Sequence, residues 1–184
     1  VDLRVEQGMI QTIAPPRALS GQIGEVVRVG AMLTPHLAEP HVHLDAALLG
    51  ERMPNISGTL VEGIQNWSVL RTALTTDDVI HRALQTAEMY AKYATTTIRT
   101  HVDTGSLLAI EAMLEVRSQL AQKGITLEIV AFPQEGILRG PGLRENWETA
   151  LGMGVDAVGA IPHFERTTEE GWESVRLAFD MAEK

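Results

Sequence analysis

The sequence contains no cysteine, and this absence removes several kinds of functional site at once. Without thiols the chain can form no disulfide, no thiol nucleophile and no thiolate metal site. It also lacks the Pro-Cys-x-x-Cys signature that one class of zinc deaminases requires. Any metal site in this chain must therefore use histidine and carboxylate ligands.

Basic and aromatic residues are also scarce. The chain has 15 Lys and Arg against 24 Asp and Glu, a formal net charge of −9, and aromatic residues make up 4% of it. Binding to a phosphate backbone needs clustered Lys and Arg, and binding to single strands needs neighbouring aromatic rings. The composition therefore argues against a nucleic-acid partner and favours a small-molecule substrate.

The sequence also lacks long apolar runs. No run approaches the roughly 20 residues that cross a bilayer, and no basic start followed by an apolar middle indicates a signal peptide. Hydrophobic residues make up 45% and charged residues 21% of the 184 residues, as in a globular domain. We expect no membrane partner. Because the chain begins at Val1 rather than methionine, the expected cytoplasmic location depends on composition alone.

The first part of the chain, residues 1–35, differs in pattern from the rest. It contains β-like runs at 3–6, 9–13 and 25–29, which are interrupted by glycines and by a Pro-Pro pair. This pattern predicts part of a small β-sandwich-like appendage.

Residues 36–184 alternate apolar strand-like segments with amphipathic helices, which is typical of a parallel sheet with helical crossovers. Strands are expected at 37–43, 96–102, 126–132 and 157–161. Helices are expected at 76–93, 107–122, 143–151 and after a capping box at Thr167 and Glu170, with Thr76 capping the first of them. The expected fold is α/β: about four β/α units, the first half of a TIM-type (β/α)8 barrel, which needs about 250 residues when complete.

The most informative motif is His41-Val42-His43 at the end of the first of these strands. Side chains on a strand alternate between faces, so both imidazoles point the same way. Neutral imidazole is a common ligand of zinc and iron, and ligands at the carboxyl end of a parallel strand lie where such folds keep their chemistry. The motif predicts half of a metal site.

Five segments in order carry a resemblance: Glu39-Pro40-His41-Val42-His43-Leu44-Asp45, Ser57-Gly58-Thr59-Leu60-Val61-Glu62-Gly63-Ile64, Arg99-Thr100-His101-Val102-Asp103, Val130-Ala131-Phe132-Pro133-Gln134-Glu135-Gly136-Ile137 and Gly159-Ala160-Ile161-Pro162-His163-Phe164-Glu165. Together they resemble the amino-terminal half of cytosine deaminase, in the metal-dependent amidohydrolase superfamily. The resemblance implies one divalent ion, Fe²⁺ or Zn²⁺, on His41 and His43. It further implies hydroxide, formed from metal-bound water, that attacks the amine-bearing carbon of the ring.

In the family the proton-shuttling glutamate belongs to a His-Cys-Asp-Glu motif on the fifth strand. The 184 residues end before that motif, so the resemblance places the catalytic acid/base, a third histidine ligand and an aspartate beyond Lys184. We therefore expect the chain alone to be inactive. It would act as a homo-oligomer or pair with the carboxyl-terminal half.

The resemblance also implies roles for the remaining candidate residues. Gln134 would bind the carbonyl and N–H edge of a pyrimidine through a carboxamide that offers both an acceptor and a donor. Phe132 and Leu60 would line the pocket. The candidates for supporting the metal or its ligands are His101, Asp103 and His163.

The substrate stays open at this point, because the chain has Ala46-Ala47 where cytosine-specific members tend to carry small hydroxyl residues. Two alternatives to a cytosine-like ring follow. One is a related amidohydrolase that acts on another N-substituted ring, such as isoguanine or a triazine. The other is a non-catalytic, truncated half-barrel.

Overall fold

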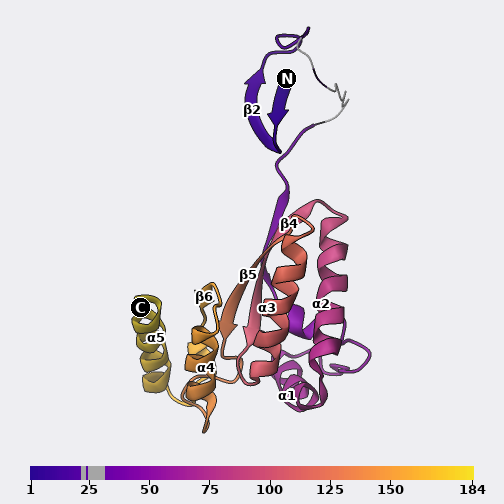
Figure 1. The fold of residues 1–184 in the computed structure, drawn as a ribbon. Helices are drawn as coiled ribbons and strands as arrows, with labels where there is room; N and C mark the ends of the chain where they lie inside the picture. The colour runs from indigo at the N-terminus through magenta and orange to yellow at the C-terminus, as the bar shows by residue number, and fades with distance from the viewer. Residues whose placement is uncertain (22–23, 25–31) are drawn as a thin grey trace. The chain divides into compact units, whose positions relative to one another are not determined.

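A computed structural model describes residues 1–21, 24 and 32–184, which form two compact units, Val1–Thr34 and Pro35–Lys184 (Figure 1). In the first unit, β1 (Asp2–Glu6) and β2 (Met9–Ala14) pair as an antiparallel hairpin. Its turn uses Gly8 at a φ of 76°, a left-handed conformation that glycine adopts readily. The β-like run expected at 25–29 lies outside the described residues.

The second unit contains a four-stranded parallel sheet with strand order β3-β4-β5-β6. The strands follow one another along the chain, and helices connect them, as expected for successive units of a barrel. Their bounds are Leu37–Val42 for β3, Thr95–Asp103 for β4, Thr126–Phe132 for β5 and Ala157–Val158 for β6.

The strand expected at 157–161 is much shorter than the pattern predicted. It ends at Val158, and Pro162, which has no N–H to donate to a ladder, opens the short 3-10 helix η3 (Pro162–Phe164). The Nε1 of Trp147 donates to the carbonyl of Gly159 at 3.2 Å, so that carbonyl is used by a side chain.

Five α-helices accompany the sheet in the described residues. They are α1 (Leu60–Leu70), α2 (Thr76–Ala91), α3 (Leu107–Ala121), α4 (Leu143–Gly152) and α5 (Thr168–Ala182). The cap predicted at Thr76 is wrong by one position: the hydroxyl of Thr75 accepts from the N–H of Asp78. The predicted cap at Thr167 is confirmed, because its hydroxyl accepts from the N–H of Glu170. No helix in the described residues is long and apolar enough to cross a membrane.

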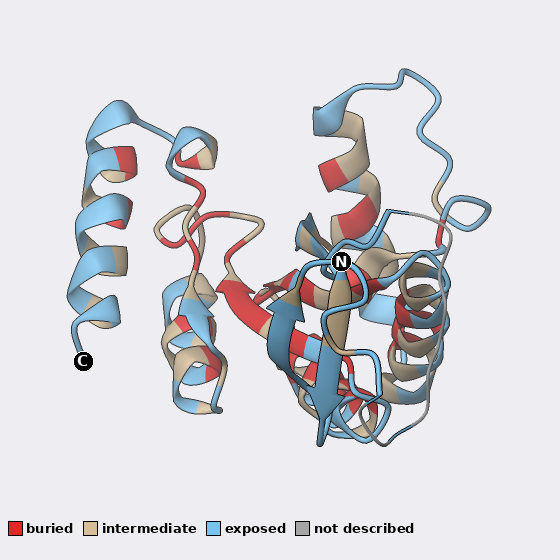
Figure 2. Ribbon diagram, turned by 90° about the horizontal axis from the view of Figure 1, so that it is seen from above, coloured by how far each residue is buried: buried red, intermediate tan, exposed pale blue. Residues whose placement is uncertain are grey.

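The core lies between one face of the sheet and the helices. Alternate residues of β4 and β5, among them Ile98, Val102 and Ile129, are fully buried on the face covered by α2 and α3. Figure 2 shows this burial along the sheet and a largely exposed α5. Arg99 and Glu128 are aligned on neighbouring strands, and their side chains form an ion pair that lies partly in solvent. The helices thus leave the other face of the sheet available for polar groups.

Candidate functional site

The predicted histidines meet at the carboxyl ends of the strands. His41 lies in β3 and His43 directly after it, 5.4 Å apart between ring centroids. His101, on β4, stacks on His41 at 3.8 Å with an interplanar angle of 14°. Phe132, the last residue of β5, contacts His43 and His101 edge-on at 5.6 and 5.7 Å. Three parallel strands therefore bring four of the candidate residues into one cluster.

Two imidazoles of this cluster, those of His43 and His101, have lowered pKa values. Burial lowers the pKa of His43 below its ordinary value. Burial, followed by the repulsion of His41 and His43, lowers the pKa of His101 to about 4. Neutral imidazole is the form that ligates metals. The Nδ1 of His101 is buried and has no hydrogen-bond partner among the described residues.

Two neighbouring neutral imidazoles suit zinc or ferrous iron as a donor set. Within residues 1–21, 24 and 32–184, no three His, Asp or Glu side chains form a group that could hold a metal ion. His41 and His43 are thus compatible with a metal as a pair of ligands, and a complete coordination sphere needs further donors.

The segment that follows His43 is fixed by buried hydrogen bonds. Arg82 of α2 donates to the carbonyls of Asp45 and Ala47 at 2.9 and 2.6 Å. The Asp45 carboxylate accepts from the N–H of Asp103 at 3.0 Å, and its burial raises its pKa to about 7. Asp45 therefore connects the end of β3 to the end of β4. Because its carboxylate is buried, Asp45 is not placed to act as a solvent-exposed general acid or base.

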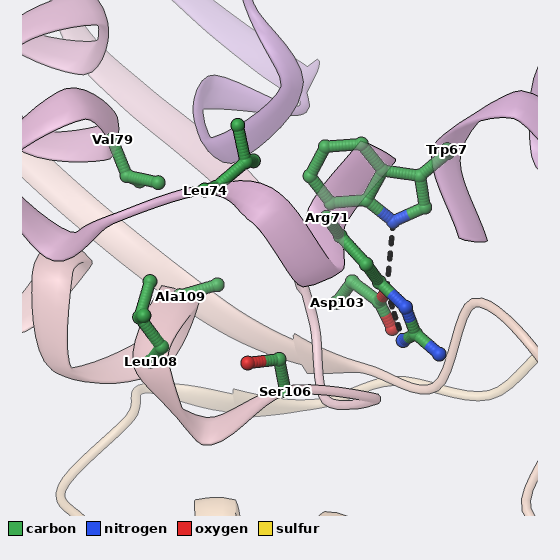
Figure 3. Close-up of a pocket in the computed structure, with 8 residues that line it drawn as sticks. All are labelled: Trp67, Arg71, Leu74, Val79, Asp103, Ser106, Leu108 and Ala109. Atoms are coloured by element: carbon green, nitrogen blue, oxygen red, sulfur yellow. Dashed lines mark hydrogen bonds and ion pairs between the residues drawn. The ribbon is translucent and has the colours of Figure 1, made fainter. Parts of the chain in front are cut away.

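Asp103 is almost fully buried, and its carboxylate lies beside Trp67 and Arg71 at the end of α1 (Figure 3). Its Oδ2 accepts from Trp67 Nε1 at 2.7 Å and from Arg71 at 2.8 Å, and its Oδ1 accepts from the N–H of Gly105 at 2.8 Å. The cavity beside Trp67, Arg71 and Asp103 has a volume of only about 10 Å³, about enough for one water and too little for a substrate. These hydrogen bonds of Asp103 attach α1 to the edge of the sheet at which the strands end.

Gln134 lies in the loop that follows β5. Its backbone N–H donates to the carbonyl of Phe132 at 3.0 Å, and its half-buried carboxamide makes no hydrogen bond to any residue that the structure describes. The next residue, Glu135, accepts from Ser68 and from Arg71, each at 2.5 Å. The loop is thus bound to α1 while the Gln134 carboxamide stays available.

A second carboxylate holds the far side of this loop. Glu165, a buried residue that follows η3, accepts from the N–H groups of Ile137 at 2.6 Å and Leu138 at 3.2 Å. Gly136 has a φ of 89°, and a Cβ there would lie 2.8 Å from a Glu165 carboxylate oxygen. Glycine is therefore required both by the backbone conformation and by the close approach of Glu165.

Besides Asp103 and Gln134, two further candidate residues lie outside the histidine cluster. Leu60, the first residue of α1, is 69% exposed and is not part of the core. His163 is exposed on η3, where with Trp172 and Val175 it lines an open groove beside α5. No hydrogen bond within the described residues connects His163, which lies in η3, to the other candidates.

Solved structures provide the comparison with known proteins. Two crystal structures of 5-methylcytosine deaminase from Klebsiella pneumoniae, liganded with 5-fluorocytosine and with phosphonocytosine, match the chain at 39% and 40% identity with TM-scores of 0.85 and 0.87. Both matches cover 98% of this chain and 45% of the deaminase chain.

A third structure, N-isopropylammelide isopropylaminohydrolase from Burkholderia multivorans, matches at 30% identity with a TM-score of 0.65 and covers 81% of this chain and 38% of its own. No protein-family model and no curated protein matches the chain. The chain spans less than half the length of the solved structures that it matches.

Proposed function

Since this chain corresponds to the amino-terminal part of the amidohydrolase barrels of cytosine deaminase type, we propose that it forms the metal-binding and substrate-recognising part of a hydrolytic deaminase. The observation that carries the proposal is the cluster of His41, His43 and His101, together with a loop after β5 in which the Gln134 carboxamide makes no hydrogen bond to any described residue. The similarity at 39–40% identity to 5-methylcytosine deaminase supports a cytosine-like ring as substrate.

His41 and His43 would hold one Fe²⁺ or Zn²⁺ ion, with His101 stacked on His41 and fixing its ring plane. When bound, such an ion lowers the pKa of a coordinated water and so supplies hydroxide near neutral pH. Burial lowers the pKa values of His43 and His101, which favours the neutral imidazole that binds metal. Asp103 would support the site at a distance, since it fixes the end of β4 through α1.

Gln134 would bind the ring edge, donating one hydrogen bond to a carbonyl and accepting one from a ring N–H. Phe132 and Leu60 would line the substrate pocket, and His163 would be a further candidate for supporting the metal or its ligands. In the reaction the oxygen of water bonds to the amine-bearing carbon and the carbon–nitrogen bond breaks. One water proton leaves with the amine as ammonia, and the other remains on the ring nitrogen. The acid/base that moves these protons would lie outside this chain.

The proposed function also assigns roles to the two segments of the chain. Residues 1–35 would contribute to a small β appendage, and residues 36–184 would form the first half of the barrel. A carboxyl-terminal half, or the association of copies of the chain, would complete the sheet. The enzyme would act in the cytoplasm, in pyrimidine metabolism.

A second candidate function keeps the metal and changes the bond that breaks. The similarity to an isopropylaminohydrolase, together with Ala46-Ala47 beside the metal-binding strand, favours a substituted ring such as a triazine, from which an alkylamine would leave. Isoguanine is the purine alternative.

The test uses the product of the intact gene, loaded separately with Fe²⁺ and Zn²⁺. Cytosine, 5-methylcytosine, isoguanine and an N-alkylaminotriazine are supplied, and released ammonia and alkylamine are measured separately. The proposal predicts ammonia from at least one of the aminopyrimidines. Release of alkylamine without ammonia would favour the second candidate function. Release of neither ammonia nor alkylamine would refute both candidate functions.

A further inference from the structure

The structure connects the two ends of the candidate site through one guanidinium. Arg71 is the first residue of the 3-10 helix η2 (Arg71–Ala73), which continues α1. It donates to Asp103 Oδ2 at 2.8 Å and to Glu135 Oε2 at 2.5 Å. Asp103 ends β4, two residues after His101, and Glu135 directly follows Gln134. One side chain therefore bridges the histidine-bearing strand and the loop that carries Gln134.

From this bridge we propose that Arg71 is a positioning residue for substrate recognition, which rests on the proposed function. Arg71 would hold Gln134 in the position that meets the substrate edge, without touching the substrate itself. The loop is bound on its far side by Glu165, so Arg71 and Ser68 supply its contacts to α1.

The chemistry of the bridge favours arginine. A guanidinium presents several N–H donors in a fixed planar arrangement and can bind two carboxylates at once, whereas the lysine ammonium is a compact charge on a flexible stem. The Arg71 side chain is only 14% exposed, and those of Asp103 and Glu135 are 4% and 22% exposed. Partial burial reduces screening by water and salt, so the Coulomb attraction within these ion pairs is stronger than in surface pairs.

Gly105 provides the space for this guanidinium. A Cβ at Gly105 would lie 1.5 Å from the Arg71 Nη1 and 2.6 Å from its Cζ. The backbone at Gly105 is not in the left-handed region, so alanine fits the local conformation and conflicts only with a flexible side-chain end. Gly105→Ala should therefore displace the guanidinium while leaving every charge in place.

The experiment compares Arg71→Ala, Arg71→Lys and Gly105→Ala in the metal-loaded product of the intact gene. Arg144→Ala serves as the control, because Arg144 forms an exposed ion pair with Glu148 within α4. The measurements are KM and kcat for ammonia release, metal content, and hydrogen exchange of the backbone amides in residues 134–138.

We expect Arg71→Ala and Gly105→Ala to raise KM about tenfold or more, with kcat within about threefold and metal content unchanged. Exchange at 134–138 should be faster in both variants. Arg71→Lys should restore part of the KM effect, and the control should match the unmodified protein. If Arg71→Ala fails to fold, the uncharged change Gly105→Ala still decides the question.

Unchanged KM and unchanged exchange in Gly105→Ala would overturn the proposal. An equal loss of kcat and metal in these variants would also overturn it, because that result indicates a general structural role. If the unmodified protein deaminates nothing, the proposed function fails. Hydrogen exchange then still shows separately whether Arg71 holds the loop.

Discussion

Substitution of Gln134 can distinguish an effect on substrate recognition from an effect on folding. The Gln134 carboxamide makes no hydrogen bond to any residue in the described part of the chain, and its backbone contact to Phe132 does not depend on the side chain. Gln134→Ala should therefore change the free energy of unfolding by less than about 0.5 kcal/mol, as for a surface substitution away from any special feature.

The expected loss appears only with substrate. Two hydrogen bonds to the ring edge, at about 0.5–1.5 kcal/mol each, amount to about 1–3 kcal/mol. At 1.4 kcal/mol for each factor of ten, this corresponds to a rise of about 5- to 150-fold in KM. Metal content should not change, because His41 and His43 lie on another strand.

Steady-state kinetics of ammonia release, metal analysis and urea unfolding provide the three readouts. Gln122→Ala is a matched control, since Gln122 is exposed at the end of α3. A variant that lost stability while keeping its KM would show that Gln134 serves the fold. The recognition role would then be refuted.

Three further predictions concern the metal, the loop and the chain itself. His41→Ala should lower metal retention at least 100-fold, because one imidazole of the His41 and His43 pair is lost; metal analysis that finds full occupancy would remove His41 from the site. Gly136→Ala should destabilise the protein by about 2–4 kcal/mol in urea unfolding, from the left-handed backbone and from displacement of Glu165, whereas Gly50→Ala, with nothing within 4 Å of its Cβ, should be nearly neutral. The isolated 184-residue chain should release no ammonia from cytosine-like rings in the same assay, and turnover by this species would contradict the proposed division of the site.

The sequence predicts the parts of the fold that depend on local pattern. The apolar run at 126–132 matches β5 exactly, because all of its signals are local. The cluster of His41, His43 and His101 also follows, since parallel strands place their carboxyl ends together. The Thr76 cap was misplaced because Thr75 and Thr76 are chemically equivalent and only the side-chain direction distinguishes them.

Other features depend on contacts that no local pattern contains. The helix α1 was not predicted, although Thr59 and Glu62 have the spacing of a capping box and the Thr59 hydroxyl does accept from the Glu62 N–H. Arg71 pairs with residues 32 and 64 positions away, so nothing near it in the sequence marks it as part of the site. The end of β6 at Val158 is likewise not determined by the run of apolar residues at 157–161.

The central claim is that His41 and His43 bind the metal that serves deamination. The most direct measurement is anomalous diffraction at the zinc or iron edge from crystals of the metal-loaded product of the intact gene. We expect one peak about 2.0–2.1 Å from a nitrogen of each imidazole, close to the Gln134 carboxamide. An active protein whose anomalous peak lies away from these two histidines would contradict it.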